Sequence, residues 1–270
     1  MPSALMRRLA VCVSSLCLGM AGISYAAMTS SDGPEPSDPL NSPMWSYTKK
    51  MFLGDASYRF DDRVRVTVPA FAEDPTQVPL QVDVSALNEP IKTMIVWADL
   101  NPIQHIYTLH ANEGKIPTVS LRFKVQQGTA VRAAVQTQAG EWLVGGQYLD
   151  ASGGGCTAPS VAAGNAYWES HLGEMQFKRF ERSEVDRLKM RVIHPMDTGL
   201  VDAIPEFYIE QLVLSRQTPQ SESVVLRMEL SQPVSENPVI QWDVATGQGV
   251  QHDYRLWMRD NNGNEFEQPL

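Results

Sequence analysis

The chain has 270 residues, of which 22 are basic and 31 are acidic, and its formal net charge is −9. An acidic surface repels phosphate groups, so this composition argues against a nucleic-acid-binding protein and favours solubility and basic partners. The length suits one large domain or two ordinary domains, each able to bury its own core.

Residues 1–26 have the pattern of a secretory signal peptide. Arg7 and Arg8 give a positive start, an apolar run follows, and small residues precede a cleavage site after Ala26. The apolar run is too short to cross a bilayer, so no membrane span is expected after cleavage. The arginine pair lacks the flanking residues of a twin-arginine signal, which favours the Sec route over Tat. The sequence therefore predicts an exported protein.

Removal of this segment would leave a single cysteine. Cys12 and Cys17 lie inside the predicted signal peptide, so the exported chain keeps only Cys156 and forms no internal disulfide. In an oxidising compartment, a lone cysteine indicates either a free thiol with a task or a disulfide to another chain. Because the segment contains two arginines and no acidic residue, the exported chain would carry a net charge of −11.

The first part of the exported chain changes from a tether to a strand-rich region. Residues 27–43 contain four prolines and almost no large apolar side chain, which predicts a disordered tether. A short helix is expected over residues 44–53. Apolar residues then alternate, which is typical of strands with one buried face. The predicted strands cover residues 64–68, 78–84, 91–98 and 119–125, and a hairpin over 129–147 turns near Gly140. We expect a first β-sandwich over residues 44–150.

The second part of the chain repeats this pattern after an interruption. Residues 151–187 break the alternation and are predicted to be a glycine-rich arm and linker. From Leu188 the alternation resumes and continues to the C-terminus. We expect a second, smaller β-sandwich over residues 188–270. The predicted fold class is all-β, with two β-sandwich domains joined by the linker.

The linker holds the one retained thiol in the stretch DASGGGCTAPSVAAGNA. Gly153, Gly154 and Gly155 precede Cys156 and predict a hinge, because glycine permits backbone conformations closed to other residues. Residues 151–166, as a flexible coil, would span roughly 20–24 Å. No Lys, Arg or His lies within ten residues of the cysteine, so no local charge lowers its pKa from about 8.5. This pattern favours a thiol that other proteins act upon over a catalytic nucleophile.

Other candidate sites are weak. His105 and His110 lie in a strand-like stretch without a carboxylate or cysteine at ligand spacing, so no metal site is predicted. His194 is expected in a turn or an interface. The three glycines lack the lysine of a phosphate-binding loop. A solvated face is predicted for four acidic residues, Glu169, Glu174, Glu181 and Glu184.

Several motifs occur in the order found in two known families. The first half resembles SoxY, the cysteine-bearing subunit of the bacterial Sox sulfur-oxidation carrier, through FLGDA, RVTVPAFAEDPTQVPLQVDV, NPIQHIYTLH and VRAAVQTQAGEWLVGGQYLDASGGGC. The second half resembles its partner SoxZ, through IHPMDTGL, MELSQPVSENPVIQW and YRLWMRDNNGNEF. Together they resemble a SoxY–SoxZ fusion of the type associated with quinoprotein dehydrogenases.

The resemblance implies two immunoglobulin-like sandwiches packed as the separate subunits pack, and a periplasmic carrier that is not itself an enzyme. It implies that Cys156 is the covalent attachment point for thiosulfate or a related sulfur species, with no metal or other cofactor. The implied partners are periplasmic Sox-type enzymes, or quinoprotein dehydrogenase and cytochrome components. Because fused carriers are associated with PQQ-dependent alcohol dehydrogenases, the cargo need not be thiosulfate.

One departure from the family pattern concerns the arm. In SoxY the cysteine lies in a Gly-Gly-Cys-Gly-Gly sequence at the carboxyl terminus, whereas Cys156 is followed by Thr157 and a second domain. An arm tethered at both ends would enter a partner enzyme as a hairpin. Fusion also fixes a one-to-one pairing of the two halves.

Two other interpretations of the sequence stay open. In the first, the protein is a non-covalent adapter for a PQQ-dependent alcohol dehydrogenase system and the thiol is incidental. In the second, Cys156 is a peroxidatic or thiol-transfer nucleophile, against which stand the lack of a nearby basic residue and of a second cysteine. A disulfide-linked dimer through Cys156 is a further alternative.

Overall fold

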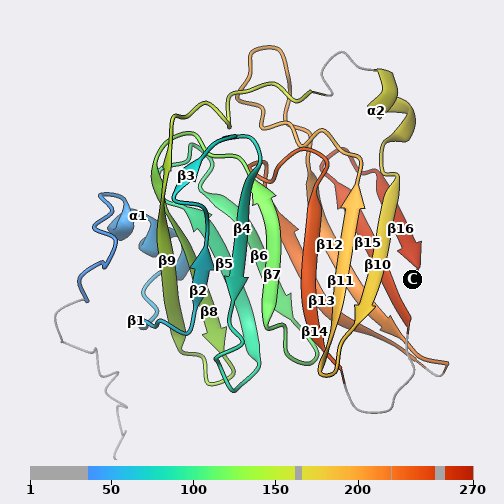
Figure 1. The fold of residues 1–270 in the computed structure, drawn as a ribbon, viewed down its shortest axis with the longest axis horizontal. Helices are drawn as coiled ribbons and strands as arrows, with labels where there is room; N and C mark the ends of the chain where they lie inside the picture. The colour runs from blue at the N-terminus through green and yellow to red at the C-terminus, as the bar shows by residue number, and fades with distance from the viewer. Residues whose placement is uncertain (1–35, 162–165, 220, 247–252, 270) are drawn as a thin grey trace, which may run out of the picture. The chain divides into compact units, whose positions relative to one another are not determined.

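The computed structural model describes residues 36–161, 166–219, 221–246 and 253–269 (Figure 1). The predicted signal peptide and residues 27–35 of the predicted tether lie outside the described residues. The prediction of a disordered tether was wrong for residues 36–43, because Asp38 in that stretch forms a 2.6 Å ion pair with the buried Arg132.

The first half contains one helix and nine strands within the described residues. Helix α1 (Trp45–Leu53) confirms the short helix expected there, and it ends at Gly54, whose φ of 62° lies in the left-handed region that favours glycine. The strands are β1 (Tyr58–Phe60), β2 (Arg65–Thr67), β3 (Phe71–Ala72), β4 (Val78–Asp83), β5 (Ile91–Ala98), β6 (His105–Ala111), β7 (Thr118–Phe123), β8 (Thr129–Thr137) and β9 (Trp142–Ala151).

The second half contains a short helix and seven strands, again counting only the part of the chain that the structure describes. The helix is α2 (Ala166–His171). The strands are β10 (Met175–Glu181), β11 (Val185–Val192), β12 (Ile209–Gln217), β13 (Glu222–Leu230), β14 (Val239–Ala245), β15 (Asp253–Asp260) and β16 (Glu265–Pro269).

The all-β prediction is confirmed, and the alternating residues have the orientation expected of a sandwich. In β4 the valines and leucine at alternate positions are buried while Pro79 and Gln81 are exposed, and β7 shows the same pattern. The inward residues of both sheets join one hydrophobic cluster that draws members from both halves of the chain. Burial of these side chains supplies the main driving force for the fold.

Two sheets run through both halves of the chain. The ten-stranded sheet has the order β1-β9-β8-β5-β6-β13-β12-β15-β16, with β3 also paired to β9, and the six-stranded sheet has the order β10-β11-β14-β7-β4-β2. The halves meet where β6 pairs with β13 and where β7 pairs with β14, both antiparallel. Figure 1 shows the green strands of the first half continuing into the orange and red strands of the second. Each half thereby covers a strand edge that the other would leave unpaired.

The second half begins earlier than the sequence indicated. Residues 151–187 were predicted to be arm and linker, but β10 and the start of β11 lie inside this range and pair with each other. The prediction missed β10 because it is an edge strand rich in polar side chains. Gln176 and Lys178 face solvent, and Arg179 occupies a partly buried position where an apolar residue would be expected. The chain passes from one half to the other between Ser152 and the start of α2.

Candidate functional site

The cysteine segment is folded against both halves of the protein. After β9 the chain turns back, and the backbone N–H groups of Gly154 and Gly155 donate to the carbonyls of Gln126 and Val125 at 3.2 and 2.9 Å. These two acceptors closely follow β7 in the first half. From the second half, the Thr198 hydroxyl donates to the carbonyl of Cys156 at 2.7 Å. The arm, expected as a flexible coil, is instead docked at the junction of the two halves.

The three glycines of the predicted hinge have different roles in this docking. Gly153 and Gly154 have φ values of 99° and 90°, in the region that residues with a side chain rarely adopt. A Cβ on Gly155 would lie 2.0 Å from the carbonyl oxygen of Pro75 and 2.6 Å from that of Val125. The first two glycines therefore permit the turn, and the third permits the close approach of the arm to the first half.

Cys156 is buried at the end of this turn, with 1% of its surface exposed. Its backbone N–H donates to the Gln126 side-chain oxygen at 3.2 Å, and its thiol donates to the backbone carbonyl of Lys124 at 3.6 Å. A thiol that donates to a carbonyl is in its protonated form, which is not the nucleophilic form. The docked arm thus holds the thiol in an unreactive state.

One cation lies within electrostatic range of the thiol. Burial raises the pKa of Cys156 to about 12, although the charge of Lys124 acts in the opposite direction. Burial also lowers the pKa of Lys124 to about 8, against the attraction of Asp197, Cys156 and Glu236. The Lys124 ammonium donates to the carbonyl of Met196, a residue whose φ of 52° is unusual for a side chain of this kind. The lysine therefore links the thiol's surroundings to the second half.

The sequence did not identify the residues that surround Cys156. Lys124 and Gln126 lie about thirty residues before it, and Thr198 lies 42 residues after it. Lys124 directly follows β7, and the alternation of Val119, Leu121 and Phe123 would place it on the outward side, so the sequence pattern did not indicate that this lysine is buried.

The predicted histidine positions have structural contacts. His105 lies beside Ser231 and Thr108, and burial lowers its pKa to about 4, while His110 lies 3.3 Å from the Thr93 hydroxyl. His194 is fully buried, accepts the Met196 backbone N–H through Nδ1, and lies 3.6 Å from Asp260. Within the described residues, no three His, Cys, Asp or Glu side chains form a group suited to a metal ion. Neither helix in this part of the chain is long and apolar enough to cross a membrane.

The raised pKa of the thiol predicts a pH-dependent difference between the wild type and Cys156→Ser. Above about pH 9 the unfolded chain releases the thiol proton while the folded protein retains it, so folding stability falls as pH rises towards the folded pKa of about 12. Serine does not titrate in this range. We expect the free energy of unfolding of the wild type to fall, relative to that of Cys156→Ser, by about 2 kcal/mol as the pH is raised from about 9 to 10.5.

Urea unfolding at several pH values measures this difference. The folded pKa of Lys124 is lowered mainly by burial, so its contribution rises with pH between about 8 and 10.5 in both proteins, and the comparison removes the part of it that does not depend on the thiol. A constant difference between wild type and Cys156→Ser over this range would contradict the buried, protonated thiol.

Comparisons with known proteins match each half to a family. The model of the sulfur oxidation protein SoxY matches residues 48–156, and that of the sulphur oxidation protein SoxZ matches residues 176–270. No curated protein matches the chain.

Solved structures give weaker similarities. The sulfur carrier protein SoxY from Chlorobium limicola f. thiosulfatophilum is 15% identical, with a TM-score of 0.36, over 40% of this chain and 90% of that one. A hypothetical protein from Pyrococcus horikoshii is 14% identical, with a TM-score of 0.25, over 37% of this chain and 84% of that one. The SoxY match ends at Cys156 and the SoxZ match begins within β10, so the two family matches divide the chain where the arm lies. The chain belongs to the Sox sulfur-oxidation carrier families, as a SoxY domain followed by a SoxZ domain in one polypeptide.

Proposed function

We propose that this protein is a periplasmic carrier that holds a thiosulfate-like sulfur intermediate covalently on Cys156 and presents it to partner redox enzymes. The sulfur-oxidation carrier role follows from the two families. The single observation that carries the finer proposal is the position of Cys156, at the last residue of the SoxY match and on a glycine-hinged segment. The protein itself is not proposed to catalyse a reaction.

The docked arm suits the unloaded state of such a carrier. The thiol is buried and its pKa is raised to about 12, so it is protected from chance oxidation and alkylation. Loading requires the arm to leave its place, because the thiol is almost completely covered in the docked position. The hydrogen bonds made by Gly154, Gly155 and Cys156 are few enough to be exchanged for contacts with a partner enzyme.

Attachment of a thiosulfate-like anion to the arm is an oxidation. A sulfur–sulfur bond forms between Cys156 and the terminal sulfur of the anion, the thiol proton is released, and two electrons pass to a redox partner. The carrier supplies the thiol and the partner supplies the electron acceptor. An intermediate bound covalently in this way is not lost by diffusion between successive enzymes.

The proposed route to the periplasm is export by the Sec pathway with cleavage after Ala26. The residues concerned lie outside those that the structure describes, so the support comes from the sequence pattern alone. A partnership with quinoprotein dehydrogenase or cytochrome components is proposed on the same basis. The alternative of a non-covalent adapter, with an incidental thiol, is not favoured by the two family matches.

Replacement of the thiol tests the covalent role. Cys156→Ser is expected to fold with an unchanged circular dichroism spectrum, to carry no sulfur adduct, and to restore no sulfur-compound oxidation to a strain that lacks the wild-type gene. The wild type and a Thr157→Ser variant, which alters an exposed neighbour, serve as controls. Full restoration of oxidation by Cys156→Ser would reject the covalent role and support the adapter.

A further inference from the structure

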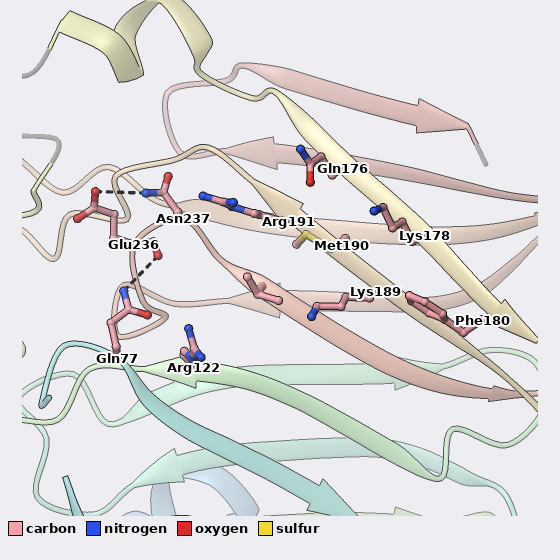
Figure 2. Close-up of a pocket in the computed structure, with 11 residues that line it drawn as sticks. Gln77, Arg122, Gln176, Lys178, Phe180, Lys189, Met190, Arg191, Glu236 and Asn237 are labelled. Carbon is pink, nitrogen blue, oxygen red and sulfur yellow. Dashed lines mark hydrogen bonds between the residues drawn. The ribbon is translucent and has the colours of Figure 1, made fainter. Parts of the chain in front are cut away.

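A basic groove lies on the outward face of the six-stranded sheet. It has a volume of about 620 Å³ and crosses the junction between the halves, since Arg122 on β7 belongs to the first half and Gln176, Lys178, Lys189 and Arg191 on β10 and β11 belong to the second. Figure 2 shows these side chains along the groove, with Phe180 at one end and Gln77, Glu236 and Asn237 at the other.

Four cationic side chains in the groove lack carboxylate partners. Arg122, Lys178, Lys189 and Arg191 are all exposed, and none forms an ion pair or side-chain hydrogen bond with the residues that the structure describes. Arg187, on the same face of β11 as Lys189, shows the contrast: it forms a two-pronged ion pair with Asp243 at 2.7 Å. In a chain with a net charge of −9, four such cations on one surface form a distinct basic patch.

The arrangement of these cations opposes folding. Lys178 and Lys189 are direct cross-strand partners in the antiparallel pair of β10 and β11, and like charges directly opposite each other destabilise a sheet. Lysine on an edge strand such as β10 also discourages edge-to-edge aggregation, which accounts for Lys178. It does not account for Lys189 and Arg191, because β11 is an inner strand paired on both sides.

The spacing of the cations favours an extended ligand. Arg122 and Lys178 lie on strands three positions apart in the sheet, a separation of about 14 Å at the usual strand spacing. In Figure 2 the four cationic groups are spread along the groove and do not meet at one point. A second hollow of about 600 Å³ shares Arg122, Lys189 and Val239, and extends the surface over β4 and β7. A single small oxyanion contacts only part of this surface.

The groove also adjoins the cysteine arm. Glu236, one of its lining residues, accepts the backbone N–H of Val161 at 2.7 Å through one carboxylate oxygen, and Val161 is itself 84% exposed. A ligand in the groove would therefore lie beside the far end of the arm. Phe180, with 48% of its surface exposed, adds an apolar contact at the other end.

We infer that this groove is a docking surface for an acidic segment of a partner protein. Charge complementarity selects the partner: aspartate and glutamate side chains would pair with the four cations, and an apolar residue would contact Phe180. Docking here would steer the partner to the side of the molecule where the arm is attached. The docking surface itself is inferred from the groove residues alone. That it brings partner enzymes to the cysteine arm rests on the proposed carrier function.

A charge reversal within the groove tests this inference. The probe is a fluorescein-labelled oligoglutamate peptide that ends in phenylalanine, and the variant is Lys189→Glu in the full exported chain. The variant is expected to fold well, because the new carboxylate would face Lys178 as an opposite-charge pair. We expect the wild type to bind the peptide more weakly as salt is raised, and Lys189→Glu to bind it at least about tenfold more weakly at low salt.

Two further variants isolate the contribution of the groove. Lys92→Glu makes the same charge change at an exposed lysine of β5, in the other sheet, and is expected to bind the peptide as wild type does. Cys156→Ser is also expected to bind normally, so a failure of the carrier function would not resemble a failure of the docking surface.

Three outcomes would overturn the inference. Equal peptide binding by wild type and Lys189→Glu would show that the groove is not used. Displacement of the peptide by free thiosulfate or sulfate, with an affinity equal to that of the peptide itself, would indicate a small-anion site. A self-association at low salt that Lys189→Glu abolishes, seen by sedimentation, would identify a second copy of this chain as the occupant.

Discussion

Gly155→Ala is expected to release the cysteine arm and to speed alkylation of Cys156 at least about 100-fold at pH 8. The added methyl carbon would lie 2.0 Å from the Pro75 carbonyl oxygen, which is fixed because it accepts the Val125 N–H at 2.8 Å. Because the backbone segments of Pro75 and Val125 are held in this way, the cysteine arm must move out of its docked position. The thiol would then regain a pKa of about 8.5 in water in place of about 12, and the reactive thiolate fraction at pH 8 would rise by roughly three orders of magnitude.

The rate of iodoacetamide labelling, followed by mass spectrometry, measures this change. Gly140→Ala is the matched control: its φ of 91° gives a backbone strain of its own, but no atom lies within 4 Å of the added carbon and the residue is in the β8–β9 turn. We expect Gly140→Ala to be labelled as slowly as wild type. Slow labelling of Gly155→Ala would contradict the docked arm.

Arg132→Met is expected to lower the free energy of unfolding by about 3–5 kcal/mol, the largest stability change that we predict. Arg132 is 1% exposed and pairs with Asp99, which is fully buried, at 2.9 Å. Asp99 also accepts the indole N–H of Trp97 and the hydroxyl of Thr48. Without the guanidinium, Asp99 would remain a buried carboxylate without a countercharge.

The same substitution would detach the start of the described chain. Arg132 pairs with Asp38 at 2.6 Å and its guanidinium lies 4.5 Å from the centre of the Trp45 ring. Burial alone would raise the pKa of Asp38, but the hydrogen bond from Arg132 and backbone N–H donors outweigh it and the pKa is lowered. Asp38 therefore stabilises the fold above its unfolded pKa, and this contribution is lost as the pH falls.

Thermal unfolding measures the effect of Arg132→Met. For a protein of this size we expect the Tm to fall by about 10 °C. The control is Arg65→Met, which removes a 3.1 Å pair with Asp83 from an exposed position and is expected to change the stability by less than about 1 kcal/mol. Similar losses of stability in both variants would show that the buried ion pair of Arg132 and Asp99 contributes no more than an exposed ion pair does.

The strands of the first half could be predicted because their sequence pattern and their burial coincide. β5 occupies the residues expected of it, and β8 and β9 form the hairpin with Gly140 at its turn. Each of these strands has its core-facing residues in alternate or continuous apolar runs. β10 was missed because an edge strand with one solvated face is free to carry charged side chains, which hides the period of two.

The joining of the halves could not be predicted from periodicity. The sequence indicates which residues face the core of a sandwich, but both β6–β13 and β7–β14 pair through backbone groups, which leave no pattern in the side chains. Periodicity therefore indicates the two β-sandwich domains but not the strand pairing by which they share both sheets.

The candidate site could be located but not described from the sequence. The glycines and Cys156 were apparent, since glycine is required where φ is positive or where backbones approach closely. The burial of the thiol depends on Lys124, Gln126 and Thr198, which are brought to it by the sheets and not by sequence proximity. The docking of the cysteine arm between the two halves therefore depends on the folded structure and could not be predicted from the sequence near Cys156.

The intact mass of the exported protein tests the central claim most directly. The protein would be isolated without reductant from cells that are actively oxidising a sulfur compound, and its free thiols blocked on lysis. We predict a chain that begins after Ala26 and carries an added mass that maps to Cys156 and disappears on reduction. A uniformly free Cys156 while the pathway is running would contradict the covalent carrier.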